Sequence, residues 1–462
     1  MTPALAAIVA YLALQFGIGI WVSRRIRNET DYLLAGRNLG YVLATFSIFA
    51  TWFGAETVMG SAGNAYRDGV SLANAEPFGY GLCLIVMGLV FARPLWKRQL
   101  TTLADLFRQR YSIGVERLAA IILVPGSILW AAAQIRAFGH VLATATEGIP
   151  IDVAIAGAAG FTMLYTMFGG LLVDAITDLI QGSILVVGLV VVLAAVLGNL
   201  QDAGGAMAVL RDAGPVTWLP ATGVSPLAFA EEWAIPICGS VVATELVGRV
   251  IATRTPDIAR RSSFVAGGLY IAIGIIPLMI GLLGQQITPG LADAEQVVPA
   301  VASYHLPTIV YAIFAGGLIS AILSTVDSTL LVASGLMSHN LIVPVFAVTE
   351  ERSKVRIARG GVLLFGAVAY VQAVRAEGVF ELVEEASAFG SAGVLVTVCF
   401  ALFTSLGGAR TAAATLLLGV TSYLVASFAG HPYPFLISLT VSLATYAIGA
   451  STGSMFGLRR HA

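Results

Sequence analysis

The feature that most constrains the fold is a series of long apolar blocks. In one of them, residues 176–200, no charged residue follows Asp178. About 20 consecutive apolar residues are enough for one helix to cross the hydrocarbon core of a bilayer. Only 11% of the 462 residues are charged, whereas soluble domains carry about 25%, so the chain cannot give a globule of this size a water-exposed surface. The sequence therefore predicts an all-α polytopic membrane protein.

We expect about thirteen transmembrane helices, which together form a single transmembrane domain over residues 1–462. The expected spans are 4–22, 41–65, 72–92, 117–146, 151–169, 174–198, 228–248, 264–286, 306–338, 357–375, 380–405, 411–429 and 433–456.

The distribution of Lys and Arg predicts the orientation. With the N-terminus outside, all but four of the 25 Lys and Arg residues lie on the cytoplasmic side of these spans. The exceptions are Arg67, Arg211 and Arg375 in outside loops and Arg136 within a span. Cytoplasmic loops of membrane proteins are enriched in Lys and Arg, so we expect the N-terminus outside and the C-terminus in the cytoplasm.

The N-terminal stretch and the loops predict the location. Basic residues follow the first apolar stretch, residues 4–21, rather than precede it. This order is the reverse of that in a cleavable signal peptide, so we expect an uncleaved first helix. The loops are compact and carry no organellar targeting signal, which favours the inner (plasma) membrane of a bacterium.

Two of the expected spans are interrupted near their middle. Residues 49–57 (FATWFGAET) combine a glycine with a carboxylate, and residues 234–240 (AIPICGS) combine a proline with a glycine. Glycine packing or a proline kink would account for each alone. However, transporters bind solutes and ions at such breaks, where irregular backbone lines a cavity. The two spans are five apart in order, which is typical of two inverted repeats.

We therefore divide the expected domain at the repeats. The expected parts are an extra N-terminal helix and loop (1–40), the first repeat (41–200), the second repeat with its preceding outside loop (201–405) and two C-terminal helices (406–462).

Polar side chains inside the spans indicate an ion site. Asp174 and Asp178 are four residues apart and so lie on one face of a helix. Residues 320–329 carry Ser320, Ser324, Thr325, Asp327, Ser328 and Thr329. Each hydroxyl alone could bond to its own helix. Together, these oxygen ligands suit a small hard cation such as sodium and offer nothing for zinc or copper.

At these residues the chain resembles the sodium:solute symporter family, which includes sodium–glucose, proline, sialic acid and choline transporters. Residues 31–40 (DYLLAGRNLG) resemble the entry to the family's first core helix, residues 169–181 (GGLLVDAITDLIQ) its fifth and residues 321–334 (AILSTVDSTLLVAS) its eighth. Arg249 followed by Ala252 resembles the end of its sixth. The resemblance implies a leucine-transporter-type fold with two inverted repeats of five helices, and alternating access driven by the inward sodium gradient.

The resemblance also implies the ion ligands. The common sodium site would consist of the carbonyl groups of Ala50, Phe53 and Ala321 and the hydroxyls of Ser324 and Thr325. A second ion site is left open, and its residues would be Asp178, Asp327 and Ser328, beside Ser324.

For the solute, the nearest resemblance is to the choline transporters. It rests on residues 50–52, 91–94 and 130–133. In that branch aromatic rings cage a quaternary ammonium group, and two cage positions correspond to Trp52 and Trp130, whereas Ala243 stands near the third. Ordinary aromatic packing is the alternative reading of these two tryptophans. The expected solute-binding residues are Trp52, Glu56, Trp130, Gln134 and Glu245.

The two glutamates in the broken helices narrow the solute class. A buried carboxylate needs a partner, and the candidates for Glu56 and Glu245 are Arg136 and a substrate amine. The sequence therefore predicts an amine-bearing or zwitterionic solute.

Other functions fit the residues less well. An intramembrane enzyme needs catalytic groups that converge at one depth, but the chain has no HExxH or GxSxG motif and only His140 lies well inside a span. We therefore expect no enzyme. A channel stays an alternative, as does a proton-coupled transporter in which Asp178 or Asp327 carries the proton. The net charge of −1 gives no attraction to nucleic acid. The expected partners are a small solute, sodium and the lipid bilayer, and no oligomeric state follows from the sequence.

Overall fold

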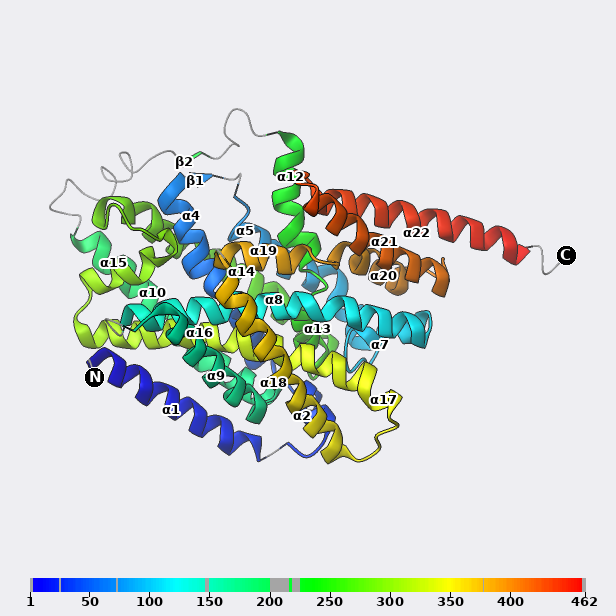
Figure 1. Cartoon of the computed structure of the whole chain (residues 1–462), viewed down its shortest axis with the longest axis horizontal. Coiled ribbons are helices and arrows are strands. Elements are labelled where there is room, and N and C mark those ends of the chain that lie inside the picture. The colour runs from blue at the N-terminus through cyan, green and yellow to red at the C-terminus, as the bar shows by residue number, and fades with distance from the viewer. Residues whose placement is uncertain are drawn as a thin grey trace.

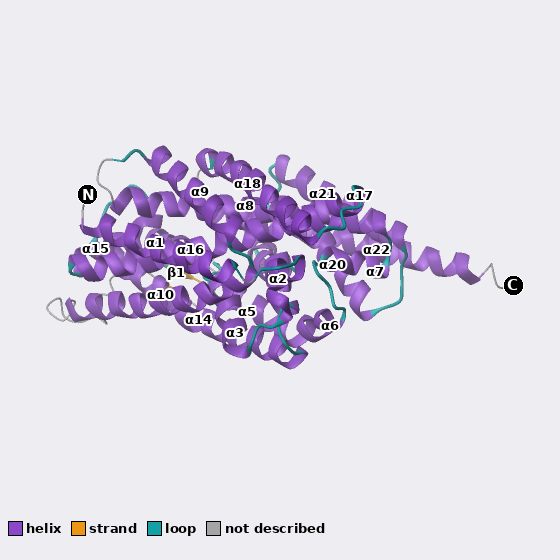
Figure 2. Cartoon of the chain, turned by 90° about the horizontal axis from the view of Figure 1, so that it is seen from below, coloured by secondary structure: helices purple, strands orange, loops and turns teal. Residues whose placement is uncertain are grey.

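The computed structural model describes residues 3–24, 26–71, 74–145, 149–199, 216–217, 225–376 and 378–458. Nearly all of this part of the chain is helical (Figures 1 and 2). Its strands, β1 (Val70–Ser71) and β2 (Val216–Thr217), pair in parallel over two residues each. Because a helix satisfies its own backbone hydrogen bonds, it is the expected element for apolar segments in a bilayer.

Among the described residues, 11 helices are long and apolar enough to cross a membrane, or 12 with one bent pair. α1 (Pro3–Ser23) coincides with the first expected span. The bent pair is α3 (Tyr41–Trp52) with η2 (Glu56–Gly60) and α4 (Ser61–Asp68). The other spans are α5–η3–α6 (Phe78–Val86, Met87–Phe91, Ala92–Lys97), α8 (Ile113–Ala145), α9 (Ile151–Phe168), α10 (Leu171–Asn199), α12–η5–α13 (Pro226–Ala234, Ile235–Gly239, Thr244–Ile251), α14 (Pro256–Ile287), α16–η7–α17 (Thr308–Gly335, Leu336–Ile342, Val343–Val345), α18 (Glu351–Arg375), α19–α20 (Val379–Ala388, Ser391–Phe403), α21 (Ala409–Phe428) and α22 (Pro434–Leu458).

Shorter helices connect these spans. They are α2 (Glu29–Leu34), η1 (Ala35–Arg37), α7 (Ala104–Arg110), η6 (Ala294–Gln296) and α15 (Val297–His305). The overall picture agrees with the expected all-α protein of about thirteen transmembrane helices.

Several expected span ends are wrong by a turn or more. The third span begins at Phe78 rather than at residue 72 and continues to Lys97. The eighth begins at Pro256 rather than at residue 264. The later start follows Pro77, the N-cap of the helix. The extensions to Lys97 and from Pro256 arise because hydropathy marks only the apolar part of a helix, whereas polar and basic residues continue the helix beyond it with their charges in water.

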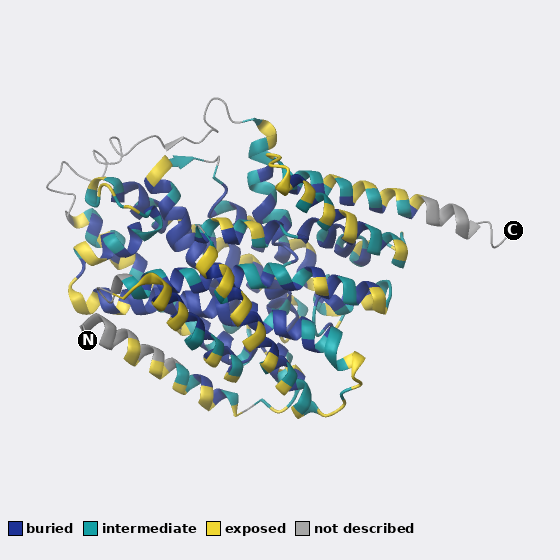
Figure 3. Cartoon of the chain, in the orientation of Figure 1, coloured by how far each residue is buried: buried dark blue, intermediate teal, exposed yellow. Residues whose placement is uncertain are grey.

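α16 is the centre of the bundle. It packs against α8, α10, α1, α18, α9 and α3, and every residue from Phe314 to Leu331 is buried. Figure 3 shows the buried residues concentrated in the middle of the molecule and the exposed ones along its outer faces. Large apolar side chains such as Val187, Ile309 and Ile448 are exposed on those faces, as expected for surfaces that contact lipid.

The first predicted break is present between α3 and η2. α3 ends at Trp52, Phe53 leaves the helical region with φ −89° and ψ 62°, and the chain bends by 53°. Gly54 makes the bend possible, because a Cβ there would lie 2.6 Å from Oε2 of Glu56 and 2.9 Å from Oε1 of Gln134.

The second predicted break is also present. α12 runs into the π-helical turn η5, and an irregular stretch follows before α13 begins at Thr244. A Cβ on Gly239 would collide with the carbonyl oxygen of Ser387, so glycine permits the close approach of α19. The expected bounds of the two repeats stay a prediction, since their junction at residues 200–201 lies outside the described residues.

Candidate functional site

The end of α3 meets the polar stretch of α16. The hydroxyl of Thr325 lies 3.2 Å from the carbonyl oxygen of Thr51 and 3.3 Å from that of Ala321. Thr51 stands between Ala50 and Phe53, two of the predicted carbonyl ligands, and all of these residues are buried. The structure thus brings the broken end of α3 and one turn of α16 together. Carbonyl and hydroxyl oxygens in such a setting are ligands that suit sodium.

Ser324 contacts the predicted second-site aspartate. Its hydroxyl donates to Oδ1 of Asp178, and the hydroxyl of Ser47 donates to Oδ2 of Asp178 at 2.5 Å. A hydroxyl that donates one hydrogen bond keeps lone pairs for a cation. Ser324 can therefore hold Asp178 and still act as an ion ligand.

The predicted second-site residues point in different directions. Ser328 donates to Oδ2 of Asp174 at 2.8 Å rather than to Asp178. Asp327 is 1% exposed, neither of its oxygens has a hydrogen-bond partner among the described residues, and it faces Gly169, which directly follows α9. A second ion site that uses all three predicted residues stays a prediction.

Arg249 is a site residue to which the sequence analysis gave no role. Its guanidinium is fully buried and pairs with Oδ2 of Asp174 at 2.5 Å. It also donates to the hydroxyl and the carbonyl of Ser47, to the carbonyl of Glu245 and to the hydroxyl of Ser328. One side chain thus joins α3, α10, α13 and α16. An arginine inside an apolar segment is a signal that could have identified it.

The two predicted cage tryptophans are in contact. The rings of Trp52 and Trp130 meet edge to face, with centroids 4.9 Å apart and an interplanar angle of 84°. Both indoles are buried, and neither Nε1 has a hydrogen-bond partner among the described residues. Because a buried indole N–H normally finds an acceptor, this pair points to a polar group that the described residues do not supply.

The glutamates of the two broken helices have neutral partners. Nε2 of Gln134 donates to Oε2 of Glu56 at 2.6 Å, while its Oε1 accepts from the backbone N–H of Ala55 at 3.0 Å. Glu245 accepts from Ser127 at 2.5 Å and from Thr244 at 3.3 Å. Neither carboxylate therefore has the Arg136 partner that the sequence suggested.

Glu245 and Trp130 line one cavity of about 40 Å³ together with Ala243. Ala243 is the small residue that stands near the expected third cage position, and the cage itself stays a prediction. We call this space, lined also by Ser240 and Ser387, the inner cavity.

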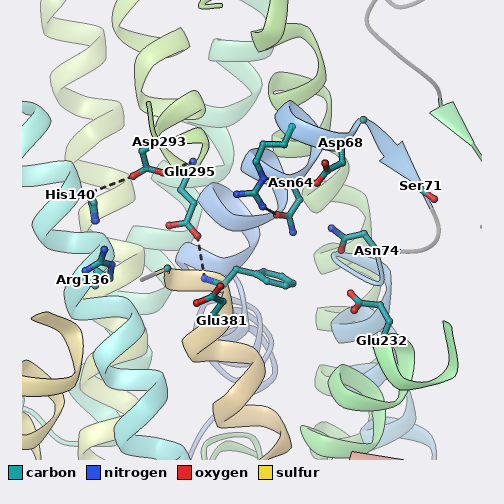
Figure 4. Close-up of a pocket in the computed structure, with 14 residues that line it drawn as sticks. Asn64, Asp68, Ser71, Asn74, Arg136, His140, Glu232, Asp293, Glu295 and Glu381 are labelled. Carbon is teal, nitrogen blue, oxygen red and sulfur yellow. Dashed lines mark hydrogen bonds and ion pairs between the residues drawn. The ribbon is translucent and has the colours of Figure 1, made fainter. Parts of the chain in front are cut away.

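Arg136 lies elsewhere, at a larger pocket of about 560 Å³ (Figure 4). There its guanidinium donates to the carbonyl of Ala373 at 3.1 Å. We call this space the outer pocket. It is lined by Asn64, Arg67, Asp68, Gly69, Ser71, Asn74, Arg136, His140, Glu232, Asp293, Glu295, Gly378, Phe380 and Glu381.

A buried glutamate beside the first break was also missed. Oε1 of Glu76 accepts from the hydroxyls of Thr57 and Tyr270, each at 2.6 Å. Thr57 directly follows Glu56 on η2, so this cluster adjoins the predicted solute residues. Glu76 falls inside the expected span 72–92, and a carboxylate within a span is the signal that could have found it.

Comparisons with known proteins fit this architecture. A profile of the sodium:solute symporter family matches residues 32–419. The chain belongs to the sodium:solute symporter family. It is 27% identical over 402 residues to the human high affinity choline transporter 1, covering 82% of this chain and 69% of that protein. It is 26% identical over 470 residues to the sodium/pantothenate symporter of Escherichia coli (strain K12), covering 97% and 96% of the two chains.

A solved structure supports the fold. A Na⁺-coupled sialic acid symporter superposes with a TM-score of 0.85 at 17% sequence identity, over 98% of both chains. The leucine-transporter-type fold is thereby confirmed. Family membership makes this member a sodium-coupled symporter of a small solute, with sodium as the coupling ion. The chain is an integral membrane protein, and the relatives named here are transporters.

Proposed function

We propose that this symporter carries an amine-bearing or zwitterionic solute, bound between the two broken helices. Trp52 and Trp130 would contact the solute. Glu56, oriented by Gln134, would neutralise the ammonium group of the solute. Glu245 would provide a second carboxylate for the solute from the inner cavity. One observation carries the proposal: Glu56 and Glu245 are 1% and 2% exposed, yet the side chains that donate hydrogen bonds to their carboxylates are neutral amide and hydroxyl groups.

The distribution of charge favours a cation over an anion. A buried carboxylate without a counter-charge is costly, and a cationic solute would supply that charge. Among the described residues, none that lines the inner cavity is a Lys, Arg or His. Arg249, the buried arginine nearby, is engaged by Asp174. An anionic solute such as pantothenate would therefore meet Glu56 and Glu245 without a cation to receive its carboxylate.

For the ion, we propose the site at the end of α3. The carbonyls of Ala50, Phe53 and Ala321 and the hydroxyls of Ser324 and Thr325 would hold sodium. The support is the contact of Thr325 with the carbonyls of Thr51 and Ala321. When bound, sodium would link the broken helix to α16, so that its release would free the two elements to separate.

We further propose the plasma membrane of a bacterium as the location, with the N-terminus outside. The support is the Lys and Arg distribution and the similarity to the Escherichia coli symporter over nearly its whole length. Cysteines placed at Glu350 and at Asp68 test the orientation, because a membrane-impermeant thiol reagent applied to intact cells should label only the second.

The experiment for the solute is sodium-dependent stabilisation of the purified chain. A ligand that binds only the folded state raises its apparent stability by an amount set by concentration over affinity. We expect sodium to stabilise alone, and one amine or zwitterion to stabilise further only when sodium is present. Glu56→Gln should abolish the second shift, and Glu350→Gln, an exposed carboxylate, should not. If Glu56→Gln left solute binding and uptake unchanged, the pairing with an amine would be wrong.

The sequence leaves a proton-coupled transporter of the same fold as an alternative; family membership favours sodium, and one observation makes the alternative testable. Asp327 is buried, and among the described residues neither of its oxygens has a hydrogen-bond partner, which is the setting of a group that carries a proton. Titrating uptake with sodium at fixed pH, and then imposing a proton gradient without sodium, separates the two mechanisms. Uptake driven by the proton gradient alone, and lost in Asp327→Asn, would favour the proton-coupled alternative.

A further inference from the structure

A small cavity lies beside Glu76, between the outer pocket and the first break. Its walls are formed by Glu76, Tyr80, Glu232, Pro236, Phe380 and Glu384, with Ala75 and Ile235. We call it the Glu76 cavity. Glu232 and Phe380 line both this cavity and the outer pocket. The two spaces therefore adjoin at these side chains.

Glu76 offers one free acceptor at this cavity. The carboxylate is 3% exposed. Its Oε1 accepts from Thr57 and Tyr270, whereas its Oε2 has no hydrogen-bond partner among the described residues. Leaving a buried carboxylate oxygen without a donor is costly, because the oxygen has lost its hydration. The free oxygen therefore marks the place of a donor that this described part of the chain does not supply.

The charges around the cavity identify that donor as a cation. Three of its lining residues are carboxylic acids, and none of its described lining residues is basic. Burial, with a smaller contribution from the neighbouring Glu232, raises the pKa of Glu76 to about 7 despite the hydrogen bonds from Thr57 and Tyr270, which lower it. A bound cation would favour the ionised form and relieve the repulsion between Glu76 and Glu232.

The size of the cavity limits the kind of cation. Its volume is about 20 Å³, and a space of about 10–15 Å³ on this measure holds one water molecule. The head of a primary ammonium group is of that size and carries three donors. A trimethylammonium group has no N–H donor and three methyl groups, so it neither fits the cavity nor satisfies Oε2.

We propose that Glu76 is a binding residue for a primary ammonium group of the transported solute, on its way from the outer pocket to the break at residues 53–55. The inference rests on the proposed transport of an amine and narrows it to primary amines. Tyr270 and Thr57 position the carboxylate. Tyr270 also packs edge to face on Phe53, with ring centroids 5.4 Å apart, so one side chain connects the Glu76 carboxylate to the broken segment.

The test compares ethanolamine with choline, which differ in the three methyl groups on nitrogen. Thermal stability of the purified full chain is measured at fixed sodium and pH 8 as each probe is titrated. We expect Glu76→Gln to weaken ethanolamine binding at least tenfold, since it removes a charge-assisted hydrogen bond, and to change choline binding less than twofold. Glutamine keeps an oxygen for Thr57 and Tyr270, and stabilisation by sodium alone verifies that the variant is folded.

A second variant distinguishes the effect of the Glu76 charge from the effect of the hydrogen bonds that position this carboxylate. Tyr270→Phe removes one hydrogen bond to Oε1 but leaves the carboxylate, so ethanolamine binding should weaken less than threefold. If both variants weaken both probes equally, Glu76 is structural and the proposal is overturned.

Other outcomes are equally decisive. If ethanolamine stabilises the wild type and Glu76→Gln alike, the Glu76 site is wrong while transport of an amine stands. If neither amine stabilises the wild type and an anionic solute does, both proposals fall. If Glu76→Gln changes only the sodium requirement, the cavity serves the ion and not the solute.

Discussion

Substituting Arg249 tests quantitatively how much its buried ion pair stabilises the transport site. We predict that Arg249→Met destabilises the protein by about 3–5 kcal/mol, the usual cost of removing one partner from a buried ion pair. The variant leaves Asp174 and Asp178 buried without the guanidinium that lies 2.5 Å and 3.8 Å from them. Both carboxylates keep hydroxyl donors, Ser328 for Asp174 and Ser47 for Asp178. The loss is therefore mainly one of counter-charge.

A second substitution shows whether charge is the cause. Asp174→Asn alone should also destabilise, because the guanidinium then loses its close partner. The double variant Arg249→Met/Asp174→Asn should be more stable than the sum of the two losses predicts, by about 1–3 kcal/mol, as found for residues in direct contact.

The assay is reversible unfolding of the purified chain in mixed micelles, followed by helix content. Arg254→Met is the matched control, because Arg254 lies close by in the chain but hydrogen bonds to Asn38 at an exposed position, and it should cost less than about 0.5 kcal/mol. If the losses in the double variant are simply additive, the ion pair does not carry the stability that we assign to it. Lost packing of the arginine stem would then be the better explanation.

Three further predictions concern binding. Thr325→Val, which keeps the shape and removes the hydroxyl, should raise the sodium concentration for half-maximal stabilisation roughly tenfold, as expected for a lost interaction of about 1.4 kcal/mol; an unchanged sodium titration would exclude this hydroxyl as a ligand. Gly54→Ala should abolish uptake while the protein still folds, because its Cβ would lie 2.6 Å from Oε2 of Glu56; normal uptake would show that the Glu56–Gln134 pair is dispensable. Ethanolamine affinity should rise roughly tenfold from pH 6 to pH 8, because a carboxyl with a pKa of about 7 loses its proton over this interval, and the rise should vanish in Glu76→Gln. The other titratable groups that face Glu76 are Glu56, Glu232, Glu384, Tyr80 and Tyr270.

The parts of the site that could be predicted are those with a local signal. Gly54, beside a carboxylate in an apolar run, marks the first break, and Pro236 with Gly239 marks the second. The polar stretch at residues 320–329 is visible for the same reason, because a polar side chain inside a bilayer span is conspicuous. Each signal lies within about ten residues of chain, which a single sequence shows directly.

The parts that were missed depend on contacts between distant segments. Tyr270 donates to Glu76 across 194 positions, and Arg249 reaches Asp174 across 75. Nothing local distinguishes Tyr270 from any other aromatic residue of an apolar helix. The same holds for Arg136, which the sequence suggests as a partner for Glu56 because both lie within spans. In the structure, Gln134 on α8 faces the break, whereas Arg136, two positions further along α8, faces the outer pocket. A helix turns by about 200° over two residues.

The arrangement of the first break explains how ion and solute could be coupled without a long pathway. The proposed sodium ligands Ala50 and Phe53 and the proposed solute residues Trp52 and Glu56 belong to one stretch of seven residues. Thr325 holds this stretch from the side of α16, and Gln134 holds it from the side of α8. An ion that fixes the carbonyls of residues 50–53 fixes the neighbouring indole and carboxylate at the same time. Positive coupling between two ligands requires only that both favour the same conformation, and a shared backbone segment meets that requirement.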